Sequence, residues 1–244
     1  MSHPKPAAKS RPRQFLEFAG LLLAAFAIRS FVAEPYEIPT GSMLPAVQIG
    51  DRLVISKLAY GARLPFTLSD QVRWGTPERG DIVVLLNPKP GGPDLAKRVV
   101  ALPGDRVAVR GGRLVLNGKE VREALIPGPC RDEDRDEESG RWVSVGCLAF
   151  EETLDHTTFQ VHHVPGSDVR DFGPIIIPPD HVFLMGDNRD RSLDSRYFGP
   201  VPIGKLKGKA FFILWSNGPD GPRWSRFLHP IRPPPQDARL AAIP

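Results

Sequence analysis

Short runs of β-branched and other apolar residues, each closed by glycine or proline, recur along this chain after residue 33. Residues 51–56, 81–86 and 211–215 are three such runs. Proline and glycine supply 27 and 23 of the 244 residues, which is about a fifth of the chain against an average near 12%. This punctuation favours short strands joined by turns over long helices.

The middle of the chain predicts consecutive hairpins and then changes character. Residues 107–109 and 114–116 flank Gly111-Gly112, and Asn117-Gly118 follows, as in tight hairpin turns. We predict a larger β domain at 34–111 and 174–225, with a smaller β subdomain inserted at 112–173. A proline-rich, irregular tail at 226–244 ends the chain.

The inserted stretch contains an acidic run and the two cysteines. Residues 131–138 hold six acids and two arginines, a composition typical of a solvated loop. Cys130 and Cys147 bracket the run without CxxC or zinc-ligand spacing. In an oxidising compartment they would form one disulfide, and two free thiols are the alternative. No metal site is predicted.

The formal net charge of +4 comes entirely from the first 13 residues, because the remainder sums to zero. The basic character therefore indicates a cytoplasmic tail at 1–14 and not a nucleic-acid-binding face. Residues 15–33 follow as an apolar segment, although its longest uncharged stretch, 18–28, is short for a membrane span. With Glu17 and Arg29 at its ends the segment is long enough, so we predict one retained transmembrane anchor. A cleaved signal peptide and an amphipathic core helix are the alternatives.

Ser42 lies nine residues past this segment, between Pro39 and Pro45. A serine hydroxyl needs a base before it becomes a good nucleophile. None of the six histidines stands in a recognisable catalytic context, and we expect His162 and His163 at the surface. HExxH and GxSxG motifs are absent.

A lysine or a carboxylate could supply the base. Lys97 has apolar neighbours on both sides, and burial among them would lower its pKa. The alternative is a strand-edge lysine that prevents aggregation. Asp187 and Asp194 lie in a run of turn formers and opposite charges, which is either a brace for a site or a surface loop. The residues alone leave these alternatives open.

Four segments, taken in order, resemble the type I signal peptidase (leader peptidase) family. They are residues 38–45 (IPTGSMLP), 80–84 (GDIVV), 97–105 (KRVVALPGD) and 186–196 (GDNRDRSLDSR). The resemblance covers most of 15–216 and is weakest across 112–173. It implies a mostly β fold in which an N-terminal transmembrane helix precedes two antiparallel β-sheet domains, the smaller inserted in the catalytic one.

The resemblance also implies roles for individual residues. Ser42 matches the nucleophile and Lys97 the neutral general base of a Ser-Lys dyad. Thr40 matches the hydroxyl that joins the Ser42 N–H in the oxyanion hole, and Ser192 the residue that orients the lysine. Four residues match bracing positions, namely Arg98 with Asp187 and Asp194 with Arg196. Three more match the walls of two small substrate pockets, namely Ile38, Met43 and Ala96.

By the same resemblance the protein would remove signal peptides from exported preproteins by cleaving after Ala-x-Ala. It would be a cofactor-free monomer in the bacterial inner membrane, with a single span, a cytoplasmic N-terminus and the catalytic domain outside the cytoplasm. Thr40 stands where the family often has serine, and the acidic run has no assignable counterpart. A dedicated peptidase for one exported substrate, a self-processing repressor and a non-catalytic membrane-tethered binding protein are the alternatives. The repressor class fits poorly, because it lacks a membrane anchor.

Overall fold

The computed structural model describes residues 17, 18, 20, 33–63, 71–136, 139–168 and 170–231. No helix within these ranges is both long enough and apolar enough to cross a membrane. The predicted basic tail at 1–14 and the predicted anchor at 15–33 lie outside the described residues, except for positions 17, 18, 20 and 33. Both stay predictions.

The largest element of the fold is a nine-stranded antiparallel sheet. Its main path runs in the order β1 (Ala33–Glu37), β2 (Asp51–Ser56), β17 (Leu206–Gly218), β5 (Ile82–Leu85), β6 (Leu95–Ala101), β15 (His181–Met185) and β16 (Val201–Pro202). Two short strands pair with β17, namely β18 (Gly221–Pro222) and β19 (His229–Pro230). Because β17 lies between β2 and β5, strands from distant parts of the chain complete this sheet together.

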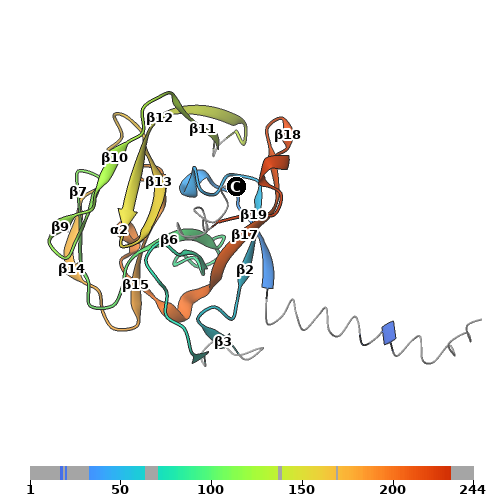
Figure 1. Ribbon diagram of the computed structural model, residues 1–244, viewed down its shortest axis with the longest axis horizontal. Coiled ribbons are helices and arrows are strands. Elements are labelled where there is room, and N and C mark those ends of the chain that lie inside the picture. The colour runs from blue at the N-terminus through green and yellow to red at the C-terminus, as the bar shows by residue number, and fades with distance from the viewer. Residues whose placement is uncertain are drawn as a thin grey trace, which may run out of the picture.

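Three smaller antiparallel sheets and four short helices complete the described fold. One sheet has the order β10 (Glu123–Leu125), β12 (Trp142–Leu154) and β11 (Cys130–Arg135), with β13 (Thr157–His163) also on β12. The others are β14 (Phe172–Ile176), β7 (Arg106–Arg110), β8 (Arg113–Leu116) and β9 (Lys119–Glu120), and the pair β3 (Gly61–Arg63) and β4 (Gln71–Arg73). The short helices are η2 (Gly41–Met43), α2 (Ser195–Phe198), η3 (Ile203–Lys205) and η4 (Trp224–Arg226). In Figure 1, β7, β9, β10 and β14 lie on the side opposite β2, β17 and β18.

The expected mostly β, antiparallel architecture is confirmed, and its apolar patterning explains where the core forms. Ile82 and Val84 of β5 pack in one buried cluster, whereas Val83 and Leu85 pack in another. Successive side chains of a strand point to opposite faces. β5 is therefore apolar without interruption because both of its faces are covered.

The predicted hairpins at 107–116 are also present. β7 pairs with β8, and Gly111 and Gly112 between them both have positive φ, a conformation that glycine adopts without strain. The expected boundaries of the inserted subdomain fall inside the sheet that contains β7, β8 and β14. The division into two domains stays a prediction.

The expectation of a solvated acidic loop is wrong for residues 131–135, which form most of strand β11. Asp132 and Asp134 are buried, while the alternate residues of the strand are exposed. Each buried acid has a basic partner: His162 for Asp132 at 2.8 Å and Arg191 for Asp134 at 3.1 Å. Because these partners lie far away in sequence, local composition could not reveal them.

His162 and His163 are not surface residues as expected. His162 is buried, and the side chain of His163 is 16% exposed. Burial opposes the charge of His163, but the carboxylates of Asp190 and Glu123 raise its pKa to about 9. The imidazolium thus joins a buried charge cluster between β10, β13 and the 186–196 segment.

Arg189 is the centre of this cluster. Its guanidinium is fully buried and donates to both carboxylate oxygens of Glu152, at 2.5 and 2.8 Å. Glu123 lies 3.7 Å from the same guanidinium. The pKa of Arg189 is raised even though burial opposes its charge, because these carboxylates stabilise the charged form. The cluster therefore ties the β10–β13 sheet to the segment that contains Arg189.

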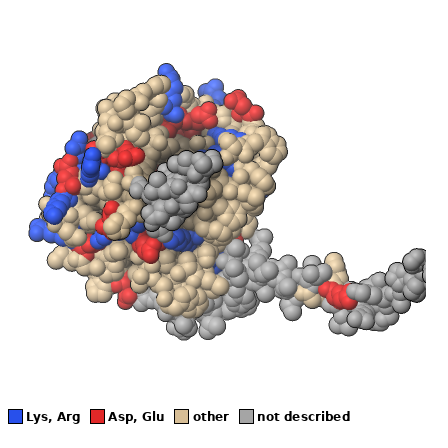
Figure 2. All heavy atoms as spheres, in the orientation of Figure 1, with Lys and Arg blue, Asp and Glu red and all other residues tan. Residues whose placement is uncertain are grey.

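Charged side chains of both signs alternate over the side of the molecule formed by β7, β9, β10 and β14 (Figure 2). No continuous basic stripe appears on the face shown there. Nucleic-acid-binding proteins gather lysine and arginine on one face. The charge on the visible face is therefore mixed, and the absence of a nucleic-acid-binding face stays a prediction.

We expect replacement of both cysteines by alanine to lower the free energy of unfolding. Cys130 and Cys147 form a disulfide between the paired strands β11 and β12. Closing a loop with a sequence separation of 17 stabilises by about 3 kcal/mol in the chain-entropy model. Urea unfolding of the double variant, compared with the oxidised parent, measures the difference. The parent must first be verified as disulfide-bonded. Equal unfolding midpoints for this parent and the double variant would contradict the expectation.

Glu152→Gln should destabilise the fold strongly. Among the described residues, the change leaves the buried Arg189 guanidinium with the more distant Glu123 as its ion-pair partner, and breaking a buried pair in this way costs about 3–5 kcal/mol. The matched control is Glu120→Gln, which removes the exposed pair with Arg113 and should cost less than about 1 kcal/mol. Equal losses in chemical unfolding of the two variants would refute the assignment of the cluster as a main stabilising contact.

Candidate active site

Ser42 lies in the middle of the three-residue helix η2, directly after strand β1 and its following turn. The turn leaves no room for a side chain at Gly41, since a Cβ there would lie 2.7 Å from Asp134 Oδ1 and 2.8 Å from Leu44 Cδ1. The Ser42 side chain is 9% exposed, and the residue lines the largest cleft described below. Glycine before the serine therefore lets β11 approach η2 closely.

Lys97 reaches Ser42 from β6, a strand paired on both sides with β5 and β15. Its Nζ donates to Ser42 Oγ at 2.7 Å and to the carbonyl oxygen of Ala96 at 2.8 Å. Lys97 is only 1% exposed. Ser42 and Lys97, which are 55 positions apart in the sequence, are thus in direct hydrogen-bond contact.

The surroundings of Lys97 favour its neutral form. Burial lowers the pKa of Lys97 to about 8, the positive charge of Arg196 adds to the decrease, and Asp194 and Asp187 oppose it. A lysine in water has a pKa of about 10.4. Near neutral pH a useful fraction of this amine is therefore uncharged and able to accept a proton.

One buried ion pair holds the 186–196 segment against the large sheet, and a second fixes the fold of the segment itself. Arg98, next to Lys97 on β6, donates to both oxygens of Asp187 at 2.7 and 2.6 Å. Asp194 accepts from Arg196 Nε and Nη2, both at 2.8 Å, and from the Gly186 N–H at 3.0 Å. Such bidentate contacts fix orientation as well as charge. The structure thus brings together all four residues expected to brace the site.

Ser192 is close to Ser42 but does not make the expected contact with Lys97 in this structure. Its hydroxyl is buried and has no hydrogen-bond partner among the described residues. A Cβ at Gly186 would lie 2.3 Å from both Ser192 Oγ and the Ser42 carbonyl oxygen, so the three residues are tightly packed. The Ala96 carbonyl, which sequence reasoning did not identify, makes the contact to Lys97 instead. The orienting role of Ser192 stays a prediction.

Two cavities meet at Ser42. A cleft of about 880 Å³ is lined on one side by Thr40 and Ser42 and on the other by residues of β11 and the 186–196 segment, including Asp134 and Arg191. A pocket of about 20 Å³ lies between η2 and β6 and is lined by Ile38, Pro39, Thr40, Ser42, Met43, Pro93, Asp94, Leu95 and Ala96. The three residues expected to line small substrate pockets all border this second cavity.

Several residues at the site were not identified from the sequence. Asp134 packs against Gly41, and Asn188 contacts the carbonyl oxygens of Gly41 and Ser42. No local signal predicts the buried position of Asp134, because the acids at 132–134 are consecutive and do not alternate with apolar residues. Nothing local distinguishes Asn188 from the other polar residues of its turn.

A possible metal-binding cluster is excluded by its own chemistry. Ligand atoms of Cys130, Cys147 and His162 lie within 4.8 Å of one another. The two sulfur atoms are bonded to each other, whereas zinc binds thiolate sulfur. While this disulfide is intact, the group cannot bind zinc through its cysteines.

Comparison with known proteins agrees with this geometry. The model of the family described as "Signal peptidase, peptidase S26" matches residues 13–215. Signal peptidase I of Pseudomonas aeruginosa is 36% identical over 219 residues, covering 83% of this chain and 72% of that protein. Signal peptidase I of Pseudomonas fluorescens is 34% identical over 214 residues, with coverage of 83% and 72%.

A crystal structure of a signal peptidase I from Enterococcus faecalis has 28% sequence identity and covers 55% of this chain and 96% of its own. Its TM-score is 0.30, too low to compare the folds in detail. The family match and the Pseudomonas relatives span most of the chain and carry the assignment. The chain belongs to the signal peptidase family, peptidase S26, and is a serine endopeptidase of the signal peptidase I type.

Proposed function

We propose that the protein cleaves signal peptides from exported preproteins with Ser42 as nucleophile and Lys97 as general base. The observation that carries this proposal is the 2.7 Å contact between Lys97 Nζ and Ser42 Oγ. Lysine acts as a base near neutral pH only where burial or a nearby cation lowers its pKa. Lys97 has both, because it is almost fully buried and Arg196 is nearby.

In this mechanism the neutral Lys97 amine accepts the Ser42 proton while Oγ attacks the scissile carbonyl carbon. The Ser42 N–H and the Thr40 hydroxyl stabilise the resulting oxyanion. Thr40 is exposed to the cleft, and its side chain makes no capping hydrogen bond to η2 that would compete. The Lys97 ammonium then protonates the leaving amine. The same residue, neutral again, activates the water that hydrolyses the acyl-enzyme.

The small pocket supports a preference for small residues before the scissile bond. Its volume of about 20 Å³ and its apolar walls at Ile38, Met43 and Ala96 leave space for little more than a methyl side chain. A larger side chain would have to displace residues that are themselves buried. This limit supports a small residue at one substrate position. The resemblance to the family extends it to cleavage after Ala-x-Ala, and we propose that Ser192 keeps Lys97 aligned during turnover.

Exposed aromatic residues support a position next to the bilayer. Trp224, Phe227 and Leu228 are 70%, 50% and 53% exposed, and Trp224 stacks edge-on against Trp215 of β17. Tryptophan is enriched where proteins meet the membrane–water interface. We propose that an anchor at 15–33 holds the enzyme, as a monomer, on the outer side of the bacterial inner membrane with its N-terminus in the cytoplasm.

Ser42→Ala and Lys97→Ala should each abolish cleavage of a preprotein while the protein stays folded. Each change removes one side of the proton transfer on which nucleophilic attack depends. The measurement is cleavage by detergent-solubilised enzyme, followed by sequencing of the new N-terminus to locate the cut after Ala-x-Ala. Near-normal turnover by either folded variant would rule out the dyad.

The rate should depend on pH through the Lys97 amine. Because only the neutral amine accepts the Ser42 proton, kcat/KM should rise through a midpoint near pH 8 and become level above it. Below the midpoint the amine is protonated, and the rate should fall about tenfold per pH unit. Initial rates with a short peptide substrate between pH 5.5 and 9.5 give the profile. A rate independent of pH over this range would count against Lys97 as the base.

A further inference from the structure

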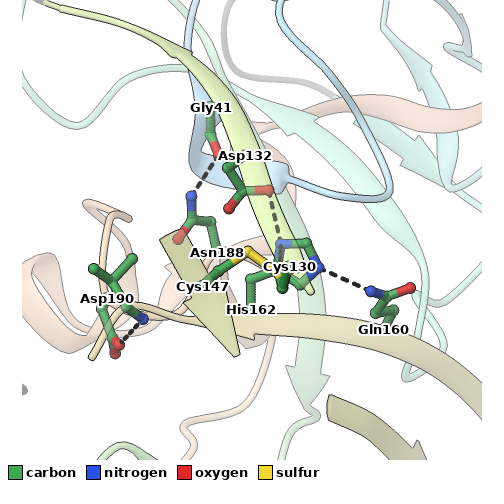
Figure 3. Close-up of a disulfide and its surroundings, with 9 residues drawn as sticks. Gly41, Cys130, Asp132, Cys147, Gln160, His162, Asn188 and Asp190 are labelled. Carbon is green, nitrogen blue, oxygen red and sulfur yellow. Dashed lines mark hydrogen bonds and ion pairs between the residues drawn. A yellow bond between two sulfur atoms is a disulfide. The ribbon is translucent and has the colours of Figure 1, made fainter. Parts of the chain in front are cut away.

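Asn188 holds the peptide units on both sides of Ser42. Its backbone N–H donates to the Ser42 carbonyl oxygen, and its side-chain Nδ2 donates to the Gly41 carbonyl oxygen, both at 3.2 Å. Figure 3 shows the amide of Asn188 directed at Gly41. Asn188 is fully buried. Sequence position gives no hint of this contact, because Asn188 and Gly41 are 147 residues apart.

The geometry of the peptide bond makes the contact to Gly41 important. The peptide unit that contains the Gly41 carbonyl also contains the Ser42 N–H, and this unit is trans. In a planar trans peptide the C=O and N–H point in opposite directions. A donor that fixes the direction of the Gly41 oxygen therefore also fixes the direction of the Ser42 N–H.

The Ser42 N–H is available to a substrate. N–H groups at the start of a short helix have no partner within the helix, and Ser42 is the second of the three residues of η2. Ser42 also lines the cleft. An N–H group in this position can stabilise an oxyanion only while its direction is maintained.

We propose that Asn188 is a positioning residue that aims the Ser42 N–H at the oxyanion. The inference rests on the proposed function, in which this N–H is one of the two oxyanion donors. Asn188 contacts neither the substrate nor Lys97 in this assignment. It acts through the peptide unit before Ser42.

Asn188 is itself fixed by β13, in the sheet that β10, β11, β12 and β13 form. The N–H of His162 on β13 donates to the Asp187 carbonyl at 2.9 Å, and the Arg189 N–H donates to the His162 carbonyl at 2.9 Å. These two bonds bracket Asn188 in a parallel bridge. The His162 ring donates to Asp132 of β11 at 2.8 Å, beside the Cys130–Cys147 disulfide (Figure 3). The Leu44 N–H also donates to the Gly41 carbonyl oxygen, at 3.1 Å. The direction of the Ser42 N–H is thus set by η2 itself together with β11 and β13, which act through Asn188.

A purely structural role explains Asn188 poorly. Its Oδ1 is buried and has no hydrogen-bond partner among the described residues. Burying an amide oxygen without a partner is unfavourable, and an apolar side chain of the same shape avoids that loss. An asparagine in this place therefore contributes through its donor, which is directed at Gly41.

Asn188→Leu tests the inference, because leucine keeps the approximate shape and removes the side-chain donor. We expect a folded protein in which kcat falls roughly 10- to 100-fold, while KM changes little. The midpoint of the pH profile should stay near 8, because the surroundings of Lys97 are unchanged. Asn188→Ala, which also lacks the side-chain donor, is the second variant in case leucine prevents folding.

Two binding measurements separate positioning from general damage. A peptide boronic acid ending in alanine, which forms a tetrahedral adduct with Ser42, should lose affinity by about the same factor as kcat. Binding of an intact signal peptide should be the same in Ser42→Ala and in the double variant Ser42→Ala with Asn188→Leu. The matched control is Gln160→Met, which removes an amide that contacts the ring of His162 but not η2 and should leave kcat unchanged.

A folded Asn188→Leu protein with kcat within about threefold of the parent, unchanged boronic acid affinity, or a displaced pH midpoint would each overturn the inference. Failure of both Asn188 variants to fold would show a structural role and reject it as well. Ser42→Ala, assayed in parallel, distinguishes failure of the proposed function from failure of the positioning role. If Ser42→Ala stays active, the proposed function fails. If it is inactive and Asn188→Leu is normal, only the positioning role fails.

Discussion

The burial of Lys97 beside Ser42 is the constraint on which the rest of the structure depends. A charged amine in an apolar interior is unfavourable, and Lys97 is only 1% exposed, so its amine has almost no access to solvent. The same burial that penalises the charge lowers the pKa of Lys97 to about 8 and makes the amine a usable base. Stability and reactivity therefore oppose each other at this residue, as is common at functional sites.

The charges around Lys97 brace the site without cancelling the decrease in the pKa of Lys97. Asp187 and Asp194 would favour the ammonium form, but each is engaged by an arginine, Arg98 and Arg196 respectively. These pairs are almost fully buried, where their geometry is well defined and removal of one partner is strongly destabilising. The bracing residues thus serve position more than net stability.

The sheet formed by β10, β11, β12 and β13 supports the site from the side opposite the large sheet. Arg189 is anchored to Glu152 of β12, and the parallel bridge between His162 and Asn188 joins β13 to the turn that contacts η2. The acidic strand β11 adds Asp134 next to Gly41 and is linked to β12 by the disulfide. Ser42, the proposed nucleophile, is therefore held between two sheets. This arrangement gives the acidic segment, which had no assignable counterpart in the family, a defined structural place.

The sequence by itself determined most of the strand content and named the proposed reacting pair. Runs such as 51–56 and the glycine pair at 111–112 have local physical causes, and Ser42 and Lys97 could be named through the ordered segments that resemble signal peptidases. Tertiary structure alone decided which groups meet. The approach of Asn188 to Gly41, the burial of Asp132 against His162 and the missing partner of Ser192 all depend on contacts between distant residues. Local patterns report propensity and periodicity, whereas hydrogen bonds and pKa values depend on which side chains the fold brings together in an interior of low dielectric constant.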